Sequence, residues 1–166
     1  LPGLFENGGV YNHCNAFKIM ADCRLGRAEQ ALSTLHKMIP DSKDNPVSIT
    51  GAEPYLFVNC WCMHPSFFTR IWFGWFTGTS AWALRGFYEG ICGLRREYGG
   101  LRVQPCIPGA WKELTLTRTF RGCRYHIHIS NTGSGKPEVT VDGNRLADTL
   151  LPVLNDGQIH EVVVRT

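Results

Sequence analysis

The stretch YGGLRVQPCIP, residues 98–108, separates two regions of different hydrophobic periodicity. Before it, apolar residues recur at helical spacing, as Ala16, Ile19 and Cys23 do. After it, apolar and polar residues alternate, as in residues 123–130, and alternation predicts half-buried strands. The sequence therefore predicts an α+β chain in which helices come first and strands second.

Two helices joined at one glycine begin the helical region. Gly26 follows the first helical pattern and can adopt the left-handed conformation that ends a helix. The second pattern stops at Pro40. A polar loop over residues 41–51 and a helix beginning at residues 52–54 are expected next.

A further helix is expected to begin at Thr79 or Ser80, both of which are good N-caps, and to end at Gly93. Gly86 and Gly90 lie inside it, and their spacing predicts close packing against another helix. Helices buried on two sides need additional partners. We therefore expect the chain to be part of a longer protein, as its lack of an initiator Met also suggests.

The second region predicts a small antiparallel β-sandwich, jelly-roll-like, with one polar face. Asp142-Gly143 is a strong hairpin signal. His126 and His128 fall on the polar face, where we expect them to be solvated. The predicted domains are residues 1–97 and residues 98–166.

Composition excludes several classes of protein. Hydrophobic residues make up 43% and charged residues 19% of 166, which is typical of a globular chain. The net charge is +3 without a Lys/Arg block, so nucleic acid is not an expected partner. No apolar run predicts a membrane span or a signal peptide. Seven cysteines, an odd number without repeated spacing, favour a reduced, cytoplasmic protein.

Three segments carry residues suited to binding an anion or a sugar. In residues 6–15, two glycines permit close backbone approach, and His13 stands at a predicted helix start, where free N–H groups attract anions. Residues 77–82 place hydroxyls and Gly78 before the next helix. Glu53-Pro54-Tyr55 is followed by Asn59. Each segment taken alone fits an ordinary turn or helix cap equally well or better.

Two other interpretations are weaker. Cys60-x-Cys62-x-His64 has no second ligand pair at metal-binding spacing, so no metal site is expected. Aromatic side chains can stack on sugar rings, but core packing is the better interpretation for most of the tryptophans that could do so, namely Trp61, Trp72, Trp75 and Trp82.

Taken together, the segments resemble the cellobiose and chitobiose phosphorylase family, which are inverting β-disaccharide phosphorylases. The resemblance covers essentially the whole chain, and its motifs occur in the family's order: ENGGVYNH at 6–13, LGR at 25–27, EPY at 53–55, TGTSAW at 77–82, YGGLRVQPCIP at 98–108 and TRTFRGCRYHI at 117–127. It implies that residues 1–97 are the last hairpins of an (α/α)₆ barrel and residues 98–166 the C-terminal β-sandwich domain.

The resemblance also implies the chemistry and the site. Inorganic phosphate, a substrate and not a cofactor, would cleave a β-linked disaccharide of cellobiose or N,N'-diacetylchitobiose type into an α-sugar 1-phosphate. His13, Asn59, Thr77 and Gly78 match phosphate-binding positions of the family, and Glu6 matches a position that binds the acceptor sugar. No cofactor is implied.

The catalytic general acid of the family is an Asp that follows a Trp in mid-barrel, and no Asp of this chain has that context. We therefore expect it upstream, together with the rest of the barrel and an N-terminal domain, and expect this chain to be inactive alone. The full-length protein is expected to form a homodimer. Two alternatives stay open: the phosphorylase-like domain of a cyclic β-1,2-glucan synthase, and a non-catalytic carbohydrate-binding module. A glycosidase would need two carboxylates flanking a sugar, and the sequence offers no such pair.

Overall fold

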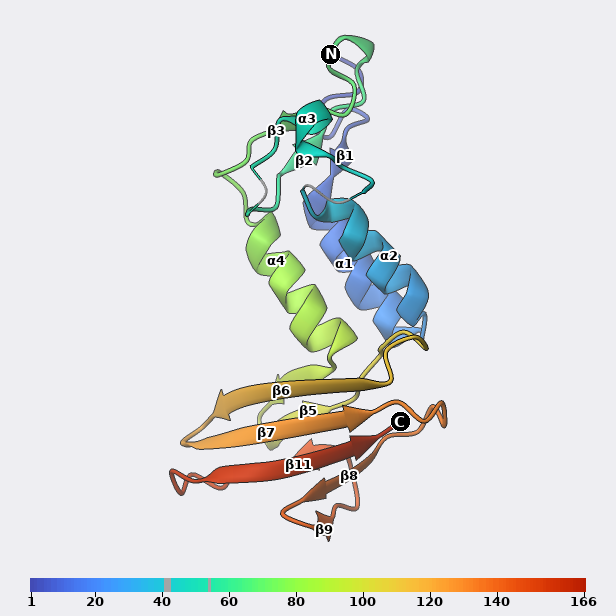
Figure 1. Ribbon diagram of the computed structural model, residues 1–166. Helices are drawn as coiled ribbons and strands as arrows, with labels where there is room; N and C mark the ends of the chain where they lie inside the picture. The colour runs from blue at the N-terminus through green and yellow to red at the C-terminus, as the bar shows by residue number, and fades with distance from the viewer. Residues whose placement is uncertain (41–42, 54) are drawn as a thin grey trace. The chain divides into compact units, whose positions relative to one another are not determined.

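A computed structural model describes residues 1–40, 43–53 and 55–166, which form two compact units, Leu1–Phe87 and Tyr88–Thr166 (Figure 1). Helix η2, Gly86–Ile91, crosses this boundary along the chain. The division after residue 97 in the sequence rests on periodicity, and the assignment of residues 1–97 to a barrel stays a prediction.

The first unit contains the predicted helical hairpin, formed by α1, Asn12–Arg24, and α2, Ala28–Met38. Gly26 has a φ of 71°. Its N–H donates to the Cys23 carbonyl at 3.1 Å, and the Arg27 N–H donates to the Asp22 carbonyl at 2.8 Å. This pattern is a Schellman motif, in which a left-handed residue lets the chain satisfy the last free carbonyls and reverse direction. The role predicted for Gly26 is confirmed.

Helix α4, Thr79–Arg85, lies beside α1 and continues into η2 (Figure 1). The predicted beginning of this helix at Thr79 is confirmed, but its N-cap residue is Gly78 and neither Thr79 nor Ser80. The rings of Phe17 and Trp82 meet edge to face with centroids 4.8 Å apart. A β-carbon on Gly86 would lie 3.3 Å from Ile19 Cγ2, which confirms the close packing predicted at this glycine.

Short elements complete the first unit. A sheet in the order β1-β2-β3 joins Val10–Tyr11, Cys60–Trp61 and Ile71–Trp72. The expected polar loop contains a helical turn, α3, Val47–Thr50, and η1 spans Pro65–Phe67.

The helix expected at residues 52–54 is wrong, as Ala52 and Glu53 have no regular structure and Pro54 lies outside the described residues. Gly51, with a φ of 69°, ends α3 and redirects the chain. Ala52 can then enter a hydrophobic cluster with Leu56, Val58 and Trp61. Burial of this apolar surface outweighs the local helix signal.

The second unit contains two sheets (Figure 1). The first has the order β10-β5-β4, and the second has the order β6-β7-β11-β8-β9. Their strands are β4 Leu94–Glu97, β5 Gly100–Val103, β6 Glu113–Phe120, β7 Cys123–Ser130, β8 Glu138–Val141, β9 Asn144–Arg145, β10 Leu150–Leu151 and β11 Ile159–Arg165.

Strands β7 and β11 pair in parallel, with Glu161 opposite His126, so the prediction of a purely antiparallel module is wrong. A parallel pair requires a long connection between its strands, and the chain between β7 and β11 includes β8, β9 and β10. Local alternation reports which face is buried but not which strand is the neighbour.

Alternation did identify the buried face correctly. Tyr125, Ile127 and Ile129 of β7 are buried, whereas Arg124 and His128 are exposed. The predicted hairpin at Asp142-Gly143 is confirmed, with φ values of 50° and 80° at its two central residues. The Tyr125 hydroxyl donates to the Pro152 carbonyl, just after β10, and so links the five-stranded sheet to the other sheet. Burial raises the pKa of Tyr125, which keeps this hydroxyl protonated as a donor.

Candidate functional site

Four of the five predicted site residues lie together in the first unit, where residues 77–79 lead into α4. The Thr77 hydroxyl donates to Asn59 Oδ1 at 3.0 Å. The Thr77 hydroxyl oxygen also accepts from the Thr79 backbone N–H at 3.1 Å and lies 2.8 Å from the Thr79 hydroxyl. Since Thr77 donates to the Asn59 oxygen, the two N–H donors of the Asn59 amide nitrogen are the groups that this side chain could offer to a ligand.

His13 reaches the same place from the first turn of α1. A β-carbon added to Gly78 would lie 2.8 Å from His13 Nε2, so the imidazole is seated directly against the glycine backbone. On the other side of the ring, Nδ1 lies 3.1 Å from the Tyr11 hydroxyl. When that hydroxyl donates to Nδ1, the proton of a neutral imidazole resides on Nε2, the nitrogen beside Gly78.

Backbone pairing explains how residues so far apart in sequence meet. The Asn12 N–H donates to the Asn59 carbonyl at 2.9 Å, and the Asn59 N–H donates to the Phe73 carbonyl at 2.9 Å. The Asn12 side chain is fully buried and donates to the Val58 carbonyl at 3.0 Å. A buried amide that is hydrogen-bonded in this way holds the start of α1 against the segment that carries Asn59.

Glu6, the fifth predicted residue, is exposed on the N-terminal loop and lines a shallow pocket with Leu1, Leu4, Phe5 and Asn7. Among the described residues, no hydrogen bond or ion pair joins Glu6 to the other four. Burial raises the pKa of the nearby Cys60 thiol, and the charges of Cys62 and Glu6 raise it further. Glu6 therefore belongs to a neighbouring surface of the same unit.

Sequence reasoning missed three supporting residues, Tyr11, Asn12 and Thr79. Thr79 is fully buried, and both its backbone and its hydroxyl contact Thr77. All three lie inside quoted motifs, Tyr11 and Asn12 in ENGGVYNH and Thr79 in TGTSAW. Their position beside a predicted site residue was the only signal in the sequence that could have identified them. Whether such a polar side chain is buried and supports the site depends on the tertiary fold.

Two of the described aspartates lie beside cationic side chains. Lys18 Nζ lies 2.6 Å from Asp22 Oδ2. In the second unit, hydrogen bonds from the Thr149 backbone and from Arg102 lower the pKa of Asp148. A general acid requires the opposite environment, one that raises the carboxyl pKa.

His160 of β11 lies between two further aspartates. Its Nδ1 is 2.7 Å from Asp142 Oδ2 and its Nε2 is 3.1 Å from Asp156 Oδ2. Hydrogen bonds that His160 donates to Asp142 and then to Asp156 raise the pKa of His160. The pKa of Asp142 is lowered chiefly by His160, and that of Asp156 by the Gln158 backbone and then by His160. The three groups form an ion-paired cluster.

The cysteines form no disulfide among the described residues, and three of them lie where burial disfavours the thiolate. All seven are free. Burial raises the pKa of Cys60, of Cys62 and, to about 12, of Cys92. The thiolate is the form that attacks electrophiles and binds metals, and these environments disfavour it.

Comparisons with known proteins define the class. The catalytic-domain model of the glycosyl hydrolase 94 superfamily matches residues 1–93, and the C-terminal-domain model of glycosyl hydrolase family 65 matches residues 94–146. The chain therefore belongs to the glycosyl hydrolase 94 superfamily.

Its relatives include phosphorylases and a synthase. The chain is 37% identical to the solabiose phosphorylase of Paenibacillus borealis, over 99% of the chain and 22% of the relative. It is 32% identical to the N,N'-diacetylchitobiose phosphorylase of Vibrio furnissii, over 85% of the chain and 18% of the relative. It is 30% identical to the cyclic β-(1,2)-glucan synthase NdvB of Rhizobium meliloti, over 86% of the chain and 5% of the relative. The chain thus spans about a fifth of the length of these phosphorylases. No helix in the described part of the chain has the length and apolar character needed to cross a membrane.

Proposed function

We propose that this chain is the C-terminal part of an inverting disaccharide phosphorylase and that His13, Asn59, Thr77 and Gly78 bind the attacking phosphate. The observation that carries the proposal is the seating of His13 Nε2 against Gly78, beside the hydroxyl of Thr77, which is itself bonded to Asn59. Imidazole and amide N–H groups can donate to phosphate oxygens, and Thr77 does so when its single O–H turns from Asn59 Oδ1 to the phosphate. Family membership, together with relatives named as phosphorylases, gives this donor set its chemical context.

The reaction proposed is reversible phosphorolysis of a β-linked disaccharide. Phosphate attacks the anomeric carbon while the glycosidic C–O bond breaks, and the general acid protonates the departing oxygen. The products are an α-sugar 1-phosphate with inverted configuration and the free acceptor sugar. An inverting hydrolase needs a second carboxylate to activate water. Phosphate is already an anion, so orientation and charge compensation replace that base.

In this proposal, residues 1–97 complete an (α/α)₆ barrel, residues 98–166 form the C-terminal β-sandwich domain, and Glu6 contacts the acceptor sugar. The general acid is supplied from elsewhere in a longer, cytoplasmic, homodimeric enzyme. The lowered pKa of Asp142, Asp148 and Asp156 supports the view that these residues are not that acid. The chain alone should form no sugar 1-phosphate, and detection of that product would contradict this part of the proposal.

The test is phosphorolysis by the full-length enzyme, assayed with phosphate against cellobiose, N,N'-diacetylchitobiose and solabiose. His13→Ala and Thr77→Ala should raise the KM for phosphate by about tenfold or more, because a hydrogen bond to a charged group contributes about 1.5–3 kcal/mol. Thr77→Ser keeps the hydroxyl and serves as the matched control. Wild-type phosphate dependence in both alanine variants would refute the assignment.

A carbohydrate-binding module without chemistry is the second candidate, since one observation favours it. The exposed rings of Tyr55 and Trp75 lie 5.8 Å apart, and Trp75 donates to Glu53 Oε1 at 3.2 Å. Aromatic faces beside a carboxylate can bind a sugar. This candidate predicts sugar binding that is lost in Trp75→Ala and is independent of phosphate.

A further inference from the structure

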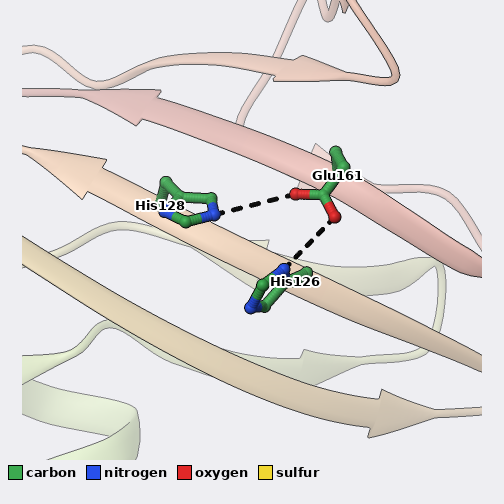
Figure 2. A group of neighbouring side chains, drawn as sticks. All are labelled: His126, His128 and Glu161. Atoms are coloured by element: carbon green, nitrogen blue, oxygen red, sulfur yellow. Dashed lines mark hydrogen bonds and ion pairs between the residues drawn. The ribbon is translucent and has the colours of Figure 1, made fainter.

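The outward face of the five-stranded sheet carries two histidines and a glutamate that point toward one another (Figure 2). His126 and His128 are two residues apart on β7, so the pleat places them on the same face. Glu161 comes from β11, where the parallel register puts it opposite His126. Only this parallel pairing brings the carboxylate to the histidines, which the sequence left as solvated side chains.

The three side chains already lie close to a metal-binding arrangement. His126 Nδ1 is 3.2 Å from Glu161 Oε1, and His128 Nε2 is 3.7 Å from Glu161 Oε2. One potential ligand atom from each residue lies within 4.8 Å of the other two. Ligands about 2.0–2.1 Å from a tetrahedral Zn²⁺ stand roughly 3.3 Å apart. Each imidazole nitrogen lies near that distance from one of the two carboxylate oxygens, so small movements of these side chains would let an ion replace the direct contacts.

Neighbouring groups also suit a cation. The Thr115 hydroxyl of β6 lies 3.3 Å from His128 Nδ1, opposite the nitrogen that faces Glu161. A hydrogen bond to the distal nitrogen of a ligating histidine sets the tautomer and the ring orientation. The ladder of backbone hydrogen bonds fixes the spacing of the strands that carry the ligands. Two cations share this face, Arg124 two residues before His126 on β7 and Arg165 four residues after Glu161 on β11, and their charges oppose the binding of a metal ion.

We propose that His126, His128 and Glu161 bind one Zn²⁺-type transition metal ion, with water completing its coordination. Two imidazoles and one carboxylate favour zinc and its neighbours over Mg²⁺ or Ca²⁺, which prefer oxygen ligands. The bound ion links β7 to β11 across their parallel pairing and thereby stabilises the second unit. This site is separate from the proposed phosphate site and does not depend on it.

The test is titration of the untagged whole chain with Zn²⁺ by calorimetry, together with the melting temperature at each zinc concentration. One ion should bind per chain and raise the melting temperature, as a ligand specific for the folded state does. His126→Ala, His128→Ala and Glu161→Gln should each weaken zinc binding by at least about tenfold, the cost already seen when a ligand-orienting partner is lost. These side chains are exposed, so the variants should melt like wild type without zinc.

Two controls keep the result specific. His36→Ala removes an exposed histidine on α2 and should bind zinc like wild type. Co²⁺ substituted for Zn²⁺ should show no thiolate charge-transfer band, because no cysteine belongs to the site. Absence of zinc binding, equal binding by all variants, or a Co²⁺–thiolate band would each overturn the proposal.

Discussion

Gly78→Ala tests the phosphate site through one defined displacement. The backbone of Gly78 has φ −81° and ψ 1°, which alanine adopts without left-handed strain. The added β-carbon would lie 2.8 Å from His13 Nε2, whereas ordinary contact begins at 3.4 Å. The ring must therefore move by roughly 0.6 Å or tilt, and it loses its alignment with a phosphate held beside Thr77.

The size of the effect follows from the hydrogen bond at risk. A bond between imidazole and phosphate contributes about 1.5–3 kcal/mol, so its loss should raise the phosphate KM by about 10- to 150-fold. Misplacement of a positioning group by about 1 Å costs a comparable factor. Stability should change little, since His13 is only half-buried and its ring can shift.

The assay is phosphate-dependent phosphorolysis in the full-length enzyme, with the melting temperature as the control for folding. The double variant His13→Ala/Gly78→Ala decides the mechanism. If the glycine acts through the histidine, the double variant should be no worse than His13→Ala alone. Additive losses, or a Gly78→Ala enzyme with wild-type phosphate KM, would refute the reasoning.

Three predictions concern the second unit. Gly93→Ala puts a β-carbon 1.9 Å from the Gln104 carbonyl oxygen at a φ of 71° and should lower the free energy of unfolding, measured by urea denaturation, by more than about 2 kcal/mol. Gly133 has a φ of 79° and no atom within 4 Å of an added β-carbon, so Gly133→Ala measures the smaller cost of the left-handed backbone alone. Ile127→Ala empties a fully buried position of β7 and should cost about 2–5 kcal/mol, measured the same way; a loss below about 1 kcal/mol would contradict its place in the core. The pKa of His160 is raised in the folded state, so the stability that His160 contributes should be complete below about pH 6.5 and be lost as pH rises through the folded-state pKa. The pKa values of Asp142 and Asp156 are lowered, so the stability that these two residues contribute should be lost as pH falls below about 3.9. Chemical denaturation across pH should therefore show a stability maximum between these limits, and His160→Gln should flatten its alkaline side.

Much of the fold was readable from local patterns. Helical spacing and Gly26 identified the α1–α2 hairpin, because a left-handed C-terminal residue is a local requirement. Alternation identified the buried face of β7, because side chains on a strand point to opposite faces in turn. Ala52 was misread as a helix start, since the hydrophobic cluster that buries it is formed by residues further along the chain.

The candidate site was predictable as a set of motifs but not as a geometry. His13, Asn59, Thr77 and Gly78 were all named from sequence, and the structure places them together. Glu6 was named with them, but it lies on a neighbouring surface.

By itself, then, the sequence determined the order of helices and strands, the buried faces and the motifs of the glycosyl hydrolase 94 superfamily, because periodicity and turn chemistry act over a few residues. The tertiary structure alone decided which distant segments meet. It paired β11 in parallel with β7, which brings Glu161 to His126, and it held Asn12 to Asn59, which brings His13 to Gly78. The physical reason is that long-range pairing is selected by burial and hydrogen bonding over the whole unit, and no local pattern encodes that selection.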